Sequence, residues 1–259
     1  MSFTSKIVLA CIAELAGMLI TLWLGVRTGA HQLAHRTGRR PSGMVQGAAF
    51  SLLGLLIGFS FYGAVGRLDY HRQLTVDEAN AISTAYARLD LLPEAAQPAL
   101  RRSFAAYIDT RIALYRSGGE PSEVERGRRA SAGLERDIWR QAVAACPPSE
   151  CPASTANLLL SSLNQVSDYA TKQMMGTLLH PPPIVIAMLF GLSLICTFLV
   201  GFDMADSEPK SWPHMLAVPL ILSVVVFVIL DVEYPRRGII RLDDFDELFM
   251  TLRQNIPLP

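Results

Sequence analysis

The sequence predicts an all-α integral membrane protein with a helical soluble domain inserted between its membrane helices. The apolar residues of the chain are clumped, and the mean hydropathy is +0.30. Windows of about 19 residues pick out four candidate membrane segments, and no strand-like alternation of useful length occurs between them. The four segments are Ile7–Val26, Val45–Gly66, Ile184–Phe202 and Met215–Leu230.

A block of ordinary soluble composition separates the second and third segments. Residues 67–181 hold 13 basic and 13 acidic side chains, so the block has no electrostatic footprint for nucleic acid, and we exclude nucleic acid as a partner. We therefore divide the chain into a first pair of membrane helices with a basic connecting loop, a helical soluble domain, a second pair of membrane helices and a C-terminal tail. The corresponding residues are 1–66, 67–181, 182–232 and 233–259.

The first apolar segment is predicted to be a retained membrane helix. Its apolar run is longer than the 7–15 residues typical of a signal peptide, and no small-x-small cleavage site follows. Glu14 lies roughly 10 Å from the start of this helix, at a depth where an ionisable group costs about 2.5–3.5 kcal/mol on insertion scales. We expect Glu14 to face protein or water, either as a protonated or hydrogen-bonded carboxyl at a helix interface or as a group near an ion path.

The second segment is predicted to continue out of the membrane as one long helix. Val45–Gly66 carries no charge, and from Arg67 onward the sequence is charged but contains no Pro or Gly until Pro93. Small residues recur every three or four positions at Gly47, Ser51, Gly54 and Gly58, a spacing that lets membrane helices approach closely.

Two stripes of side chains on this helix are candidates for the lining of a narrow pore. A stripe of bulky apolar residues can gate a pore by dewetting, but the same residues can equally face lipid or the protein core. Arg67, repeated around a ring of subunits, would concentrate anions at the pore mouth. One stripe is Leu53, Ile57 and Phe61, and the other is Ser51, Leu55 and Phe59.

The stalk that follows Arg67 and the rest of the soluble block are predicted to be helical. Asp77, Glu78 and Asn80 lie beside the apolar stripe of the stalk, where we expect a solvated face or a subunit contact. Ser122 and Glu125 have the spacing of a capping box. The three further helices expected are Glu94–Arg116, Glu123–Ala145 and Thr155–Leu179.

The sequence indicates no metal, cofactor or catalytic site. His31 and His35 are four residues apart, but no carboxylate or cysteine lies nearby to complete a metal shell. Cys146 and Cys151 are close enough to form a disulfide in a loop, whereas a zinc site would need two more ligands. No Walker A, nucleophile-elbow, dinucleotide-binding or zinc-protease motif occurs, so we do not predict an enzyme.

Residues at two places in the chain resemble a known family. The first group lies on the helix that leaves the membrane, and the second is an acidic segment with a proline after the last membrane helix. In both groups the chain resembles the bestrophin-like family of bacterial membrane proteins. The matching residues are Arg67, Arg72, Leu74 and Asn80 in the first group, and Asp231, Glu233 and Pro235 in the second.

This resemblance implies a homopentamer that conducts ions passively, with anions such as chloride as the expected ions. It also implies a pore neck on the second membrane helix, and alignment on Arg67 and Leu74 places the neck at Ser51, Leu55 and Phe59. Ser51 departs from the pattern, since a bulky residue is expected there. The acidic segment that helps to bind calcium in animal bestrophins is matched only loosely, so we do not expect calcium here.

An oligomeric passive anion channel is thus the leading prediction, with membrane lipid and small inorganic ions as its other partners. The alternative is a non-conducting membrane sensor or scaffold whose helical domain binds a partner protein. We expect a multi-pass protein of the bacterial inner membrane. Eight basic residues near the membrane ends against five, together with the resemblance, place the soluble domain in the cytoplasm. A Cys146–Cys151 bridge would oppose that placement, because disulfides suit an oxidising compartment.

Overall fold

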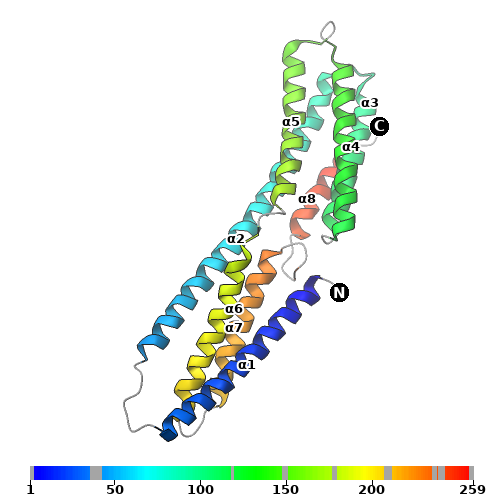
Figure 1. Ribbon diagram of the computed structural model, residues 1–259. Coiled ribbons are helices and arrows are strands. Elements are labelled where there is room, and N and C mark those ends of the chain that lie inside the picture. The colour runs from blue at the N-terminus through cyan, green and yellow to red at the C-terminus, as the bar shows by residue number, and fades with distance from the viewer. Residues whose placement is uncertain are drawn as a thin grey trace. The chain divides into compact units, whose positions relative to one another are not determined.

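The computed structural model describes residues 3–35, 43–117, 120–147, 151–176, 180–206, 212–234, 238 and 243–256. All regular structure in these ranges is helical (Figure 1), which confirms the predicted all-α class. Four helices in these ranges are long and apolar enough to cross a membrane, as predicted. The chain forms two compact units, a membrane unit of residues 1–67 and 180–234 and a soluble unit of residues 68–179 and 235–259. The division that we predicted from the sequence differs mainly in the C-terminal tail, which we treated as a separate part and which here belongs to the soluble unit.

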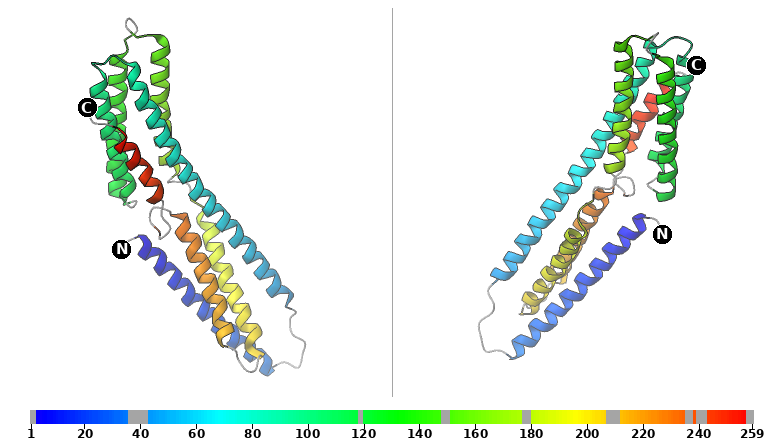
Figure 2. Two further views of the ribbon diagram at one scale, coloured as in Figure 1. Left: turned by 180° about the vertical axis from the view of Figure 1, so that it is seen from behind. Right: turned by 45° about the horizontal axis from the view of Figure 1, so that its top comes forward.

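The membrane unit contains α1 (Phe3–His35), the first half of α2 (Met44–Ala87), α6 (Pro183–Asp203) and α7 (Trp212–Glu233). Helices α1 and α6 run side by side in the same direction, as both views of Figure 2 show. The hydroxyls of Thr21 and Thr197 lie 2.8 Å apart across this contact. Helix α1 is longer than the predicted Ile7–Val26, because helix-compatible residues continue past the apolar run to His35.

Glycines allow α1 and α6 to touch backbone to backbone. A Cβ atom on Gly25 would lie 2.1 Å from the carbonyl oxygen of Phe198, and one on Gly201 would lie 2.1 Å from that of Leu22. In a membrane, such close packing of small residues supplies much of the attraction between helices, because lipid is as apolar as the side chains.

Replacing Gly201 by valine is expected to separate α1 from α6, since the carbonyl of Leu22 is backbone and cannot move aside. Overpacking costs about 1–3 kcal/mol in ordinary cores, and we expect a loss at or above that range here. The thermal midpoint of the detergent-solubilised protein measures this loss. Gly191→Val is the matched control on the same helix, because a Cβ atom there meets no atom within 4 Å. Equal midpoints for the two variants would contradict the prediction.

Helix α2 is a single helix from Met44 to Ala87, as the absence of Pro and Gly in its second half predicts. The helix ends at Ala87, whereas we expected it to continue to Pro93, and a 3-10 turn, η1 (Arg88–Leu91), follows. Leu92 is then extended, with a ψ of 159°. A proline disfavours the helical region for the residue before it, which explains why the chain leaves the helix here.

The soluble unit packs the second half of α2 with α3 (Gln97–Arg116), α4 (Pro121–Ala145), α5 (Ala153–Gly176) and α8 (Asp243–Gln254). The three predicted soluble helices are present, but the capping box is wrong. Helix α4 begins two residues earlier than predicted, with Glu120 as its N-cap and no side-chain capping hydrogen bond. Pro121 at the first position already fixes the backbone for helix.

Helix α8 was not predicted from the sequence. Phe249 on this helix is fully buried and packs edge-on against Tyr115 of α3, with ring centroids 5.0 Å apart. Arg253 donates to the Asp109 carboxylate at 2.8 Å. The end of the chain therefore completes the core of the soluble unit.

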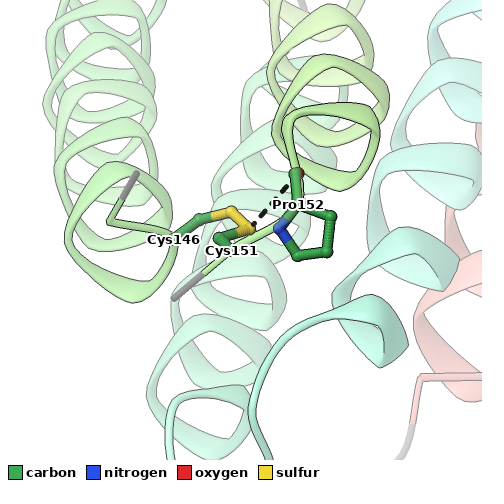
Figure 3. Close-up of a disulfide and its surroundings, with 3 residues drawn as sticks. All are labelled: Cys146, Cys151 and Pro152. Carbon is green, nitrogen blue, oxygen red and sulfur yellow. Dashed lines mark hydrogen bonds between the residues drawn. A yellow bond between two sulfur atoms is a disulfide. The ribbon is translucent and has the colours of Figure 1, made fainter. Parts of the chain in front are cut away.

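The turn between α4 and α5 is closed by a disulfide. Figure 3 shows Cys146, at the end of α4, joined to Cys151, just ahead of α5. Their Cα atoms lie 4.9 Å apart, within the usual range for a disulfide. Cys146 and Cys151 thus form the disulfide that their spacing in the sequence indicated was possible.

Candidate ion pathway and its flanking charges

The membrane half of α2 is far less buried than the other membrane helices. Only 11% of its most apolar window is buried, against 28%, 33% and 39% for α1, α6 and α7. Leu53 is 1% exposed in the core of the membrane unit, so α2 is attached to its own subunit on the side that carries Leu53. The helix therefore presents most of its apolar surface away from its own subunit.

The two predicted stripes lie on different sides of α2. In the first, Leu53 is buried and Ile57 packs against the same core, while Phe61 is exposed. In the second, Ser51, Leu55 and Phe59 are all exposed, Phe59 at 67%. At 3.6 residues per turn, Leu55 lies about 160° around the helix from Leu53. The second stripe thus faces away from the subunit core.

Three glycines of the predicted small-residue face of α2 have open space beside them in the described part of the chain. A Cβ atom on Gly47, Gly54 or Gly58 would meet nothing within 4 Å. The Ser51 hydroxyl is also exposed and donates to the carbonyl oxygen of Gly47 at 2.8 Å. This face, next to the stripe of Leu55 and Phe59, is open to another helix.

Arg67, where the membrane half of α2 ends, forms an ion pair with Glu233 at the end of α7. Its Nε and Nη2 atoms donate to Glu233 Oε2 at 3.0 and 2.5 Å. The Glu233 side chain is 2% exposed, and its other oxygen lies 3.5 Å from Nδ1 of His180. The His180 ring also packs against that of Tyr234, with ring centroids 4.8 Å apart and the ring planes tilted by 38°. Arg67, which we expect at the pore mouth, thus has its charge paired with a buried carboxylate in the single subunit.

Glu14 lies in the interior of the membrane unit, on the side of α1 that faces protein. It is buried near Cys11 and Met18. Neither carboxylate oxygen accepts a hydrogen bond from any residue that the structure describes. The position avoids lipid, and a neutral carboxyl would avoid the cost of an isolated buried charge.

The remaining residues of the resemblance fall in different surroundings. Leu74 is buried in the soluble unit, while Asn80 is exposed. Arg72 is half-buried and donates to Asp69 at 3.2 Å. Asp231 and Glu233 are both buried near the end of α7, and Pro235 lies outside the described residues.

A buried ion pair in the soluble unit was missed by the sequence analysis. Glu78 is fully buried inside the unit, whereas we expected a solvated face or a subunit contact, and its Oε1 lies 2.6 Å from Nε of Arg111 on α3. Arg111 Nη2 donates to Glu78 Oε2 at 2.8 Å, and the Tyr115 hydroxyl donates to the same oxygen. The local pattern around Glu78 is that of a surface helix, and nothing in it indicates a partner 33 residues away.

Comparison with known proteins places these features in a family. The model of the bestrophin-like domain matches residues 12–244. The chain belongs to the bestrophin-like family. The predicted resemblance is thereby confirmed, and the four apolar helices are those of a membrane protein. Comparison with curated proteins found no match.

Solved structures of bestrophin homologues share the fold of this bestrophin-like chain. A variant of a bacterial homologue from Klebsiella pneumoniae superimposes with a TM-score of 0.74 at 13% identity, covering 99% of this chain and 97% of that one. A second variant gives a TM-score of 0.73 at 12% identity, covering 97% of both chains. The zinc-phased structure of the homologue gives 0.70 at 12% identity, covering 96% and 97%.

Proposed function

We propose that this bestrophin-like protein is a passive ion channel formed by a ring of identical subunits around α2. The observation that carries the proposal is the low burial of the membrane half of α2, whose apolar and small residues point away from their own subunit. One copy of a single lining helix cannot enclose a pore, so a channel requires a closed symmetric ring. A pentamer is the ring that the family resemblance implies.

The narrowest part of the proposed pore is formed by Ser51, Leu55 and Phe59. These residues lie opposite the attachment of α2 at Leu53, so they are the stripe that a central axis can reach. The glycine face beside them is free to pack on the neighbouring α2 helix. The resulting constriction contains no charged side chain and would exclude water unless it widens.

Two measurements test this function. Mass measurement of the protein in nanodiscs is expected to give a pentamer, and planar-bilayer recording of the same sample is expected to give steady currents without an energy source. A monomer at all accessible concentrations would remove the channel hypothesis. A stable oligomer that carries no current would instead favour the alternative of a membrane sensor or scaffold.

Anion preference is proposed to depend on how far Glu233 neutralises Arg67. In the present pairing the guanidinium charge is compensated by a buried carboxylate. Glu233→Gln keeps the shape but removes the negative charge, so Arg67 gains an uncompensated positive charge. We expect the anion-to-cation permeability ratio to rise roughly tenfold, the lower end of what focused charge does to local ion concentration. Reversal potentials in a potassium chloride gradient measure this ratio.

Arg72→Gln is the control for this charge change, because its partner Asp69 is exposed and solvent screens the pair. We expect little change in the permeability ratio. A Glu233→Gln channel with unchanged reversal potential would show that the ion pair lies off the ion path.

The soluble unit is proposed to lie in the cytoplasm of a bacterial cell, with the protein in the inner membrane. The basic residues near the membrane ends and the family resemblance support this orientation. The Cys146–Cys151 bridge opposes it, because disulfides rarely persist in a reducing cytoplasm. We expect no labelling of these cysteines by a membrane-impermeant thiol reagent in intact cells treated with reductant. Labelling without lysis would reverse the orientation.

A further inference from the structure

A hollow of about 380 Å³ lies within the soluble unit, between α3, α4 and α5. Three aromatic side chains line it, namely Phe104 and Tyr107 from α3 and Trp139 from α4. Leu163 of α5 adds to the apolar wall. Pockets that combine such a lining with a few converging polar groups are typical sites for small organic ligands.

The Glu135 carboxyl is one of the polar groups that line this hollow. The Tyr107 hydroxyl donates to its Oε1 atom at 3.2 Å. Burial raises the pKa of Glu135, while hydrogen bonds from Ser167 and Tyr107 act in the opposite direction. These two donors orient the carboxylate but supply no positive charge.

Among the residues that the structure describes, no cation forms an ion pair with Glu135. The buried Arg111 acts electrostatically on Glu135, but its guanidinium forms an ion pair with Glu78 instead, with Nε 2.6 Å from Oε1. Arg136 lines the hollow but is exposed, and no ion pair joins Glu135 to any residue in the described part of the chain. A half-buried carboxylate without a countercharge attracts a cation more strongly than a solvated one does, because the local dielectric constant is lower.

We propose that this hollow binds a small organic cation, a primary ammonium carried on an aromatic or apolar body. The ammonium group donates to Glu135, and the exposed ring of Trp139 adds cation–π attraction. The apolar body of the ligand packs against Trp139, because Phe104 and Tyr107 are fully buried. The chain thus carries a ligand site in its soluble unit in addition to the proposed pore.

Isothermal titration calorimetry of the assembled full-length protein in detergent tests the proposal. The probe is phenethylammonium, compared with 2-phenylethanol, which has nearly the same shape but no charge, and with phenylacetate, which is an anion. We expect phenethylammonium to bind at least about tenfold more tightly than either, since a charge-assisted hydrogen bond is roughly twice as strong as a neutral one. Equal binding of the alcohol, or no binding of any probe, would overturn the proposal.

Two variants test the carboxylate and the exposed aromatic ring of the site separately, and a third is the control. Glu135→Gln is expected to lower phenethylammonium affinity about tenfold or more, while Glu125→Gln, at a partly exposed position on the same helix, leaves it unchanged. Trp139→Ala should weaken phenethylammonium binding and reduce its advantage over 2-phenylethanol, because the cation–π contact is lost. All three variants are first shown to assemble by size-exclusion chromatography, and undiminished binding by Glu135→Gln would overturn the assignment.

Proton release gives a readout that a purely structural Glu135 would not produce. A bound cation stabilises the carboxylate and lowers the pKa that burial has raised. Binding near that pKa must therefore release a proton, and affinity must fall as the pH falls through it. Titrations in two buffers of different ionisation enthalpy measure the release. An absence of release at every pH where the probe binds would contradict a direct role for Glu135.

Discussion

Arg111→Met is expected to destabilise the soluble unit by roughly 3–5 kcal/mol, the usual effect of removing one partner of a buried ion pair. The reason is that Glu78 would remain fully buried, with the Tyr115 hydroxyl as its one remaining donor among the described residues. Methionine fills much of the volume of the arginine stem, so the loss measures charge more than packing. Urea unfolding of the detergent-solubilised protein, followed by circular dichroism, gives the change in unfolding free energy.

Arg129→Met is the matched control for this substitution. Arg129 pairs with Glu125 on the surface of α4, where both side chains are well exposed, and such a pair contributes about 0.3–0.5 kcal/mol. The double variant Glu78→Leu with Arg111→Met removes both charges and is expected to recover much of the lost stability. A double variant no more stable than Arg111→Met alone would show that the arginine contributes through packing.

The membrane helices could be predicted from the sequence because the signal is local and long. An uncharged run such as Val45–Gly66 must bury its backbone polar groups in a helix wherever lipid surrounds it, so neighbouring elements are not needed to predict it. The predicted C-terminal ends of α1 and α2 were less accurate. The observed ends, His35 and Ala87, lie in polar and charged stretches, where helix and loop differ little in local free energy.

The missed features depend on contacts between residues far apart in the chain. Helix α8 is only 12 residues long, and an isolated helix of that length is marginal in water. It is stabilised by the burial of Phe249 against Tyr115, which no pattern within the tail can reveal. Glu78 likewise looks like a surface residue until Arg111 is brought to it from α3.

The sequence alone also could not show which of the two stripes of α2 faces away from its own subunit. Both have the same spacing and similar side chains, so periodicity cannot rank them. The burial of Leu53 in the subunit core identifies the side on which α2 is attached. The family resemblance implies a neck at Ser51, Leu55 and Phe59, and all three are exposed in the single subunit, whereas only Phe61 of the other stripe is.

Phe59→Ala is expected to raise single-channel conductance several-fold in the proposed pore. Phe59 is the bulkiest side chain of the exposed stripe and is 67% exposed in the single subunit. Around a ring, its truncation widens the constriction at every subunit at once and weakens the exclusion of water that limits conduction. Planar-bilayer recording in symmetric potassium chloride measures the conductance, with assembly checked by mass in nanodiscs.

Phe61→Ala is the matched control, because it removes the same side chain from the same helix about 160° away. Phe61 belongs to the stripe whose other members pack in the subunit core, so its truncation should leave conductance unchanged. A rise with Phe61→Ala and none with Phe59→Ala would assign the pore to the stripe of Leu53, Ile57 and Phe61. If neither truncation changes the current of a protein that still assembles, α2 does not line the pore, and its exposed face serves contact between subunits alone.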